Sequence, residues 1–321
     1  MKDFILTNTP DWTDAYGDLK RKDGVFFNID KLMKTYQLSR LQAIEVQRTF
    51  KDLVMESEDV SPQEIFDRAL KLVQDDQLVR VNRAEIEAAQ FIIVFDLDET
   101  LYDQGLRSDN ECANVNYSYA GKPKKIFTVK NIKAKMRKIR DLGGVVAIFS
   151  ANSQNLTVQN LKNWKNEEGQ DVYSMSEISA VLTGKELILQ PKEAGQVIVS
   201  SAKDLRFFDE RLGKVIIVDD NPTRIFQHKN IRVVKKLDGD AYCQEETLRN
   251  AYDSIIDEVL TEIEDSVKYM EQTKVNFVTA YSPYSMMGKL AVDLLVSAEG
   301  ISKAEAIKKV RENQHFVEPR F

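Results

Sequence analysis

Residues 91–102 of this 321-residue chain read FIIVFDLDETLY, and they give the clearest indication of its fold. The first five of these residues are all apolar, and an unbroken apolar run is typical of a strand buried on both faces at the centre of a parallel sheet. The run leads directly into Asp96 and Asp98, so both carboxylates are expected at the carboxyl end of the strand, where open α/β sheets bind their ligands. Two acids in such a place cost desolvation energy, which indicates a metal ion or a cationic group beside them.

Two more apolar runs end in polar residues. The run VVAIF, residues 145–149, leads into Ser150, Ala151 and Asn152, and the run VIIV, residues 215–218, leads into Asp219-Asp220-Asn221-Pro222. Between the two runs, Lys203 opens the segment KDLRFFDERLG, which we interpret as an amphipathic helix leading into the third strand. The pattern predicts an α/β fold in which the polar ends of three buried strands supply one site.

In this order, the segments resemble the haloacid dehalogenase superfamily of aspartate-nucleophile phosphatases. The DLDETL start, the KDL segment before the last strand and the Asp-Asn-Pro end are most similar to its subfamily of small C-terminal-domain phosphatases, the FCP/SCP type. The resemblance covers residues 91–236, under half of the chain. It implies a Rossmannoid parallel sheet and a Mg²⁺-dependent phosphatase.

The resemblance also implies three catalytic residues. Asp96 is expected to attack phosphorus and become an aspartyl phosphate. Asp98 is expected to protonate the leaving oxygen and later to deprotonate the attacking water. Lys203 lies sixteen positions before Asp219, as the family layout requires, and its ammonium is expected to stabilise the phosphoryl oxygens. Lys192 and Lys214 are the alternatives for this role.

The same resemblance implies the binding residues. The phosphate site is expected to comprise Thr100, which also orients the nucleophile loop, together with Ser150, Ala151 and Asn152. The expected cofactor is Mg²⁺, an ion that prefers hard oxygen ligands. Its expected ligands are Asp96, Asp98, Asp219 and Asp220, with Asp219 binding directly and Asp220 directly or through water.

Histidine and cysteine supply few alternatives. The chain has only His228 and His315, which leaves little for a mechanism based on a histidine base. Cys243 and Arg249 have the C-x5-R spacing of cysteine-dependent phosphatases, but the loop between them has no glycine and carries two glutamates that would repel phosphate. We interpret this match as chance. Two cysteines and no secretory signal peptide predict a reducing, cytoplasmic location, with delivery into a host cell left open.

Composition and spacing bound the substrate class. The chain has 43% hydrophobic and 30% charged residues, as a globular enzyme does, and no run approaches the roughly 20 apolar residues that span a bilayer. Peripheral membrane contact is not expected either. The intervals from Thr100 to Val145 and from Ser150 to Lys203 are too short for a large folded cap, although the second holds a predicted hairpin over residues 186–200. An open site favours phosphate groups on macromolecules.

Three regions are expected along the chain. Residues 1–90 are predicted to be helical, with a capping box at Ser61-Pro62-Gln63-Glu64, and to form a platform packed on the core or, alternatively, a partner-binding unit. Residues 91–240 are the predicted phosphatase core. Residues 241–321 are predicted to be helical again, with Ser302 and Glu305 capping the last helix.

Charge is distributed unevenly along the chain, whose net charge is −6. Residues 121–140 contain nine Lys or Arg and no acid, whereas residues 243–272 contain nine acids and two basic residues. The segment Lys122–Arg140 is either a solvated helix face or a docking surface for an anionic partner. The acidic helix is a further candidate for that surface, within the same chain.

The sequence as a whole favours a phosphatase acting on phosphorylated proteins or peptides, at serine, threonine or tyrosine. A nucleic-acid 3′-phosphatase or a nucleotidase is the enzymatic alternative, supported only by the basic segment. A binding or scaffold protein with an inactive core of the same fold is the alternative from another class, and no lost catalytic position favours it.

Overall fold

The structure, a computed structural model, describes residues 1–6, 25–56, 60–75, 81–103, 113, 115–119, 122–152, 154–166, 168–189 and 201–317. Cys112, Lys192 and the second half of the predicted hairpin lie outside these ranges. None of the helices within them is long and apolar enough to cross a membrane.

A five-stranded parallel sheet with the order β13-β12-β3-β7-β9 forms the centre of the molecule. Its strands are β3 (Phe91–Phe95), β7 (Gly144–Phe149), β9 (Ile178–Leu182), β12 (Val215–Asp219) and β13 (Ile231–Val233). All five residues of β3 are buried, because β3 is the middle strand and is covered on both faces. A side chain at Gly144 would meet the ring of Phe91 at 2.3 Å, so only glycine allows β7 to pack this closely. The predicted α/β parallel-sheet fold is confirmed.

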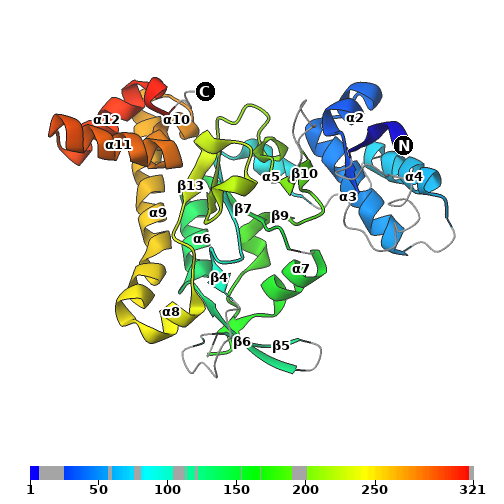
Figure 1. Ribbon diagram of the computed structural model, residues 1–321, viewed down its shortest axis with the longest axis horizontal. Coiled ribbons are helices and arrows are strands. Elements are labelled where there is room, and N and C mark those ends of the chain that lie inside the picture. Colours follow the sequence, from blue (N-terminus) through cyan, green and yellow to red (C-terminus); the bar gives the residue numbers. More distant parts are fainter. Residues whose placement is uncertain are drawn as a thin grey trace.

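Helices cover the sheet on both faces (Figure 1). Successive residues of a strand point to opposite faces, and Phe91, Ile93 and Phe95 therefore enter one hydrophobic core while Ile92 and Val94 enter the other. The first core is shared with α6 (Ile132–Asp141), α9 (Glu246–Thr273) and α10 (Phe277–Tyr281). The second core is shared with the N-terminal helices.

The N-terminal region is helical, as predicted. It consists of β1 (Ile5–Leu6), β2 (Phe26–Phe27), α2 (Ile29–Tyr36), α3 (Arg40–Glu56), α4 (Pro62–Gln74) and α5 (Arg83–Ala88). The predicted capping box is present, since Ser61 and Glu64 each accept from the backbone N–H of the other. Buried rings of Phe27, Phe50 and Phe66 pack these elements together.

The C-terminal region is also helical, with α8 (Gly239–Gln244), α9, α10, α11 (Met286–Glu299) and α12 (Lys303–Glu312). The predicted caps Ser302 and Glu305 are confirmed. Apolar residues of α9, among them Val259 and Ile263, lie in the same core as the strands. The proposed boundary between residues 240 and 241 stays a prediction.

The insertions between the strands are small. After β3, a four-stranded antiparallel sheet forms from β4 (Tyr102–Asp103), β5 (Val115–Tyr119), β6 (Lys122–Thr128) and β8 (Lys165–Asn166). Helix α7 (Gln154–Asn163) follows β7, and β10 (Ile188–Leu189) pairs antiparallel with β11 (Ser201–Ala202), as a hairpin would. The single-turn 3-10 helices are η1 (Lys2–Phe4), η3 (Met175–Glu177), η4 (Leu205–Phe207), η5 (Pro222–Arg224), η6 (His228–Asn230), η7 (Ser282–Tyr284) and η8 (Gln314–Val317). Within the described ranges, no large folded cap is present.

Several side chains of the basic segment are engaged within the chain. Residues 122–128 are strand β6, and basic side chains in and next to α6 form ion pairs with acidic residues of the chain. Lys130 and Lys135 contact Asp253 and Asp257 of α9 at 3.0 and 2.9 Å, and Lys138 contacts Glu264. Figure 1 shows α9 alongside α6. Part of this surface therefore meets the acidic helix of the same chain, one of the occupants that the sequence offered, and an anionic partner at Lys122–Arg140 stays a prediction.

The segment that begins at Lys203 is not an amphipathic helix. The N–H of Lys203 donates to the carbonyl of Arg224, and the N–H of Phe226 donates to the carbonyl of Lys203, which holds Lys203 in an extended conformation. Only the 3-10 turn Leu205–Phe207 follows, with Asp204 accepting from the N–H of Arg206. Pairing with a distant segment has overridden the local helical pattern.

Candidate active site

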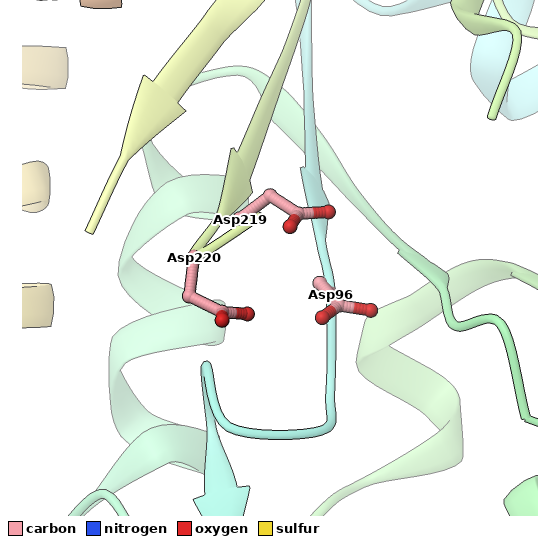
Figure 2. Close-up of side chains that lie close together, drawn as sticks. All are labelled: Asp96, Asp219 and Asp220. Atoms are coloured by element: carbon pink, nitrogen blue, oxygen red, sulfur yellow. The ribbon is translucent and has the colours of Figure 1, made fainter. Parts of the chain in front are cut away.

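Three carboxylates meet at the carboxyl ends of β3 and β12. Oxygen atoms of Asp96, Asp219 and Asp220 all lie within 4.8 Å of one another. Figure 2 shows these three side chains gathered where the two strands end. Because β3 and β12 are parallel neighbours, acids that directly follow their apolar runs come to the same edge of the sheet.

Lys203 supplies the positive charge of this cluster. Its Nζ donates to Oδ1 of Asp96 at 2.7 Å and to Oδ2 of Asp219 at 2.6 Å, and the side chain is buried. The alternative Lys214 is engaged elsewhere, since its Nζ donates to the carbonyls of Ile86 and Glu87. The structure therefore brings Lys203, not Lys214, to the acidic cluster.

The cluster has perturbed acid–base properties. Burial raises the pKa of Asp96 to about 7, opposed by the ammonium of Lys203 and assisted by the charge of Asp219. Burial also raises the pKa of Asp220, against the hydrogen bond from Thr100. The pKa of Lys203 is raised too, because its two carboxylate partners more than offset the effect of burial.

The donor set fits a divalent cation. Asp96, Asp219 and Asp220 offer carboxylate oxygens, which hard cations such as Mg²⁺ and Ca²⁺ prefer. Lys203 balances only part of their negative charge, and a divalent cation would balance the rest. The N–H of Asn221 donates to Oδ1 of Asp219 at 2.7 Å, which fixes the orientation of that carboxylate.

The carboxylate of Asp98 is not a member of this cluster. It accepts hydrogen bonds from the hydroxyls of Tyr102 and Ser150, at 2.5 and 2.9 Å, and from the side-chain amide of Asn152 at 3.2 Å. The expectation that the side chain of Asp98 binds the metal is thus not supported by the geometry. Three neutral donors instead hold it beside the cluster, in a different environment from Asp96.

Ser150, Ala151 and Asn152 follow β7 at the same edge of the sheet. The hydroxyl of Ser150 donates to Asp98 and accepts from the N–H of Asn152 at 3.0 Å, so it is already engaged. Ala151 is half-buried beside it. The loop reaches the position expected for a phosphate site, but two of its side chains hold Asp98.

Thr100 also holds a carboxylate. Its hydroxyl donates to Oδ1 of Asp220 and accepts from the N–H of Asp220, both at 3.0 Å. Thr100 therefore connects the loop after β3 to the end of β12. Glu99 precedes it with φ of +61°, which makes the loop turn sharply after Asp98.

Tyr102 is a residue of the candidate site that sequence reasoning missed. It is buried, packs edge-on against the ring of Trp164 at 4.6 Å between centroids, and donates to Asp98. Tyr102 ends the segment FIIVFDLDETLY, and its position four residues after Asp98 could have indicated that it contacts this carboxylate.

Cys243 is disulfide-bonded, and the described residues include no free cysteine. The expectation of reduced cysteines is therefore wrong for this residue. Without a free thiol, Cys243 cannot act as a nucleophile. This agrees with the interpretation of the C-x5-R spacing as a chance match.

Comparisons with solved structures return distant similarities. The chain is similar to Fcp1, an essential RNA polymerase II CTD phosphatase, at 13% sequence identity and a TM-score of 0.34, covering 70% of this chain and 75% of that chain. It is also similar to the fission yeast RNA polymerase II CTD phosphatase Fcp1 bound to beryllium fluoride, at 14% identity and a TM-score of 0.31, covering 73% of this chain and 64% of that chain. No curated protein matches.

The family follows from a match of sequence. The family model described as NLI interacting factor-like phosphatase matches residues 91–266, more than half of the chain. The match begins at the first residue of β3 and includes the segments that supply Asp96, Asp98, Lys203 and Asp219. This protein belongs to the NLI interacting factor-like phosphatases, which are phosphatases of the FCP/SCP type within the haloacid dehalogenase superfamily.

Proposed function

We propose that this protein is a Mg²⁺-dependent phosphatase that hydrolyses phosphate monoesters on proteins through an aspartyl phosphate at Asp96. One observation carries the proposal: two carboxylates two residues apart lie in different environments. Asp96 is paired with Lys203, whereas Asp98 is held by three neutral donors. Neighbouring carboxylates in different environments are suited to different roles in acid–base and nucleophilic catalysis.

In the first step, a carboxylate oxygen of Asp96 attacks phosphorus and the bond between phosphorus and the ester oxygen breaks. The leaving oxygen takes a proton from Asp98, and the leaving group departs as an alcohol or phenol. Lys203, at hydrogen-bond distance from Asp96, offers positive charge next to the transferring phosphoryl oxygens. The products of this step are the dephosphorylated substrate and the aspartyl phosphate.

In the second step, water attacks the phosphorus of the aspartyl phosphate while Asp98 removes its proton. The bond between phosphorus and Asp96 breaks, which releases inorganic phosphate and restores both carboxyl groups. The hydroxyls of Tyr102 and Ser150 keep the Asp98 carboxylate in one orientation through both steps. The amide of Asn152 supports the same orientation.

Asp96, Asp219 and Asp220 are the residues that would hold Mg²⁺. When bound, the ion would neutralise charge between the attacking carboxylate and the phosphate. The raised pKa of Asp96 supports this assignment, because a nucleophile must be ionised and Lys203 alone leaves the pKa at about 7.

The substrate class rests on the small size of the insertions. The described parts of the chain include only the four-stranded sheet β4-β6-β5-β8 and the β10–β11 pair, and neither is a large cap. A site of this kind admits a phosphate on a polypeptide. The nucleic-acid alternative depended on a basic surface, and Lys135, Arg137 and Lys138 of that surface are paired with acidic residues of α9 or with Glu177. The cytoplasmic location stays a prediction, and the disulfide at Cys243 counts against a fully reducing compartment.

A panel of phosphoserine, phosphothreonine and phosphotyrosine peptides, together with a 3′-phosphorylated oligonucleotide and p-nitrophenyl phosphate, tests the proposal. Release of phosphate is measured with EDTA and with added Mg²⁺. We expect turnover of at least one class of phosphopeptide, dependent on Mg²⁺, and no turnover by the Asp96→Asn variant. Turnover of the oligonucleotide alone would move the substrate class to nucleic acid, and full activity of Asp96→Asn would refute the mechanism.

A further inference from the structure

We infer that Arg48, in the N-terminal region outside the family match, is a positioning residue for the active-site loop Ser150–Asn152. The inference rests on the proposed function of that loop and deepens it. It assigns a role to a region whose sequence indicated only a helical platform.

The side of α3 that faces the sheet is polar and docks onto the loop Thr183–Leu187. Nε2 of Gln47 donates to the carbonyls of Lys185 and Leu187, both at 2.9 Å. A guanidinium nitrogen of Arg48 lies 2.8 Å from Oε1 of Glu186, and both side chains are buried. Figure 1 shows α3 near β10, the strand that directly follows this loop. These polar contacts join α3 to the loop Thr183–Leu187, in addition to the ion pair of Arg40 with Asp204 and the apolar contacts of the shared core.

The contact between Arg48 and Glu186 acts through charge. The nitrogen and oxygen that approach each other are not aligned as a hydrogen bond, so the pair is an ion pair. Arg48 is the cation that the structure brings to Glu186 within the described residues. A buried carboxylate that loses its cation must take up a proton or move toward water.

Glu186 in turn shapes the turn that contacts the active-site loop. Its other oxygen, Oε2, accepts from the N–H and the hydroxyl of Thr183, at 2.7 and 2.9 Å. The next residue, Gly184, donates its N–H to the carbonyl of Asn152 at 2.9 Å. A side chain at Gly184 would lie 2.8 Å from the carbonyl oxygen of Ala151, so the two loops touch backbone to backbone.

Hydrogen bonds from the active-site loop connect it to the carboxylate of Asp98. Asn152 and Ser150 both donate to Asp98, and the N–H of Ser150 donates to the carbonyl of Leu182, the residue before Thr183. A shift of the turn at Thr183 therefore moves two of the three donors of Asp98. Catalysis is sensitive to such shifts, since a misplacement of about 1 Å can cost roughly 100-fold in rate.

The test compares Arg48→Met with a control on the same helix, in the full chain. Phe50→Leu is the matched control, because Phe50 is buried against the ring of Phe27 within the N-terminal region. We expect Arg48→Met to lower kcat for p-nitrophenyl phosphate about 10- to 100-fold with little change in KM. We expect Phe50→Leu to lower Tm but to change kcat less than about twofold, and Arg48→Lys, which keeps the charge, to recover part of the lost kcat.

Hydrogen exchange supplies a readout that is independent of activity. Arg48→Met should increase amide exchange in residues 150–152 and 183–186, and Phe50→Leu should not. If the wild-type protein hydrolysed none of the substrates, the proposed function would fail while this exchange result would still decide the positioning role. If Arg48→Met did not fold, Arg48→Lys would carry the comparison. The inference would be overturned if Arg48→Met kept the kcat and the amide exchange of the wild type. It would also be overturned if Arg48→Met and Phe50→Leu lost kcat equally.

Discussion

Asp96→Asn should stabilise the metal-free protein at neutral pH while it abolishes activity. An asparagine cannot attack phosphorus, so no aspartyl phosphate forms. At the same time, the amide removes a buried negative charge that lies among Asp98, Asp219 and Asp220. Because asparagine resembles the protonated acid, the stability of the variant should match that of wild-type protein in which Asp96 stays protonated.

The magnitude follows from the pKa of Asp96. An aspartate in an unfolded chain has a pKa of about 3.9, whereas burial raises the pKa of Asp96 to about 7 in the folded protein. Between about pH 4 and pH 7, the unfolded chain has lost this proton and the folded protein keeps it. The free energy of unfolding therefore falls as the pH rises through this window, and the loss is complete above it. At 1.36 kcal/mol per pKa unit, the full difference is about 4 kcal/mol.

Urea denaturation in EDTA at pH 5 and pH 8 measures this effect. At pH 8, the free energy of unfolding of Asp96→Asn should exceed that of the wild type by up to about 4 kcal/mol. This difference in free energy should be smaller at pH 5. Asp141→Asn is the control, because Asp141 is exposed at the end of α6. Added Mg²⁺ should stabilise the wild type more than the variant and narrow the gap. If the variant were less stable than the wild type in EDTA at pH 8, a buried and unfavourable charge at Asp96 would be excluded.

Asp98→Asn should accumulate aspartyl phosphate, because the second step loses its base, and labelled phosphate retained on acid-quenched protein measures this; no label would count against the assigned role. Asp219→Ala should abolish activity at any Mg²⁺ concentration, since the cation loses a ligand and Lys203 loses a partner, as titration with MgCl₂ after EDTA would show. Glu262→Gln should lower the free energy of unfolding by about 3 kcal/mol or more, because Arg232 is buried against it, and unchanged urea denaturation would contradict this. Replacing Lys130 and Lys138 by alanine should cost about 1 kcal/mol or less per ion pair and leave KM for an acidic phosphopeptide unchanged, whereas a higher KM would support the docking surface.

The predictable part of this protein lies in its buried strands. The apolar runs at residues 91–95, 145–149 and 215–218 identify strands of a parallel sheet, because a strand covered on both faces needs apolar residues at every position. Parallel strands end at one edge, so the meeting of Asp96 with Asp219 and Asp220 follows from the order of the segments alone. Helix caps at Ser61 and Ser302 were readable for a similar reason, since a cap is a contact between residues three positions apart.

Contacts between polar groups far apart in the sequence were decided by the tertiary structure. The extended conformation at Lys203 depends on pairing with residues 224–226, and a helical pattern in the local sequence gave the wrong prediction. The basic residues of α6 met the acids of α9 because both helices pack on one face of the sheet. Periodicity indicates which face of an element is buried, but it does not indicate which charged group lies opposite.

The same limit applies inside the active site. That Asp96 and Asp98 follow the central strand can be predicted from the sequence, because the apolar residues before them indicate a buried strand. That Asp98 turns away from the other acids toward Tyr102, Ser150 and Asn152 is visible in the folded protein alone. The same holds for Arg48, more than a hundred residues earlier in the chain than Ser150, which is linked to that loop through Glu186. Each of these orientations depends on hydrogen-bond partners that three-dimensional packing alone brings within reach.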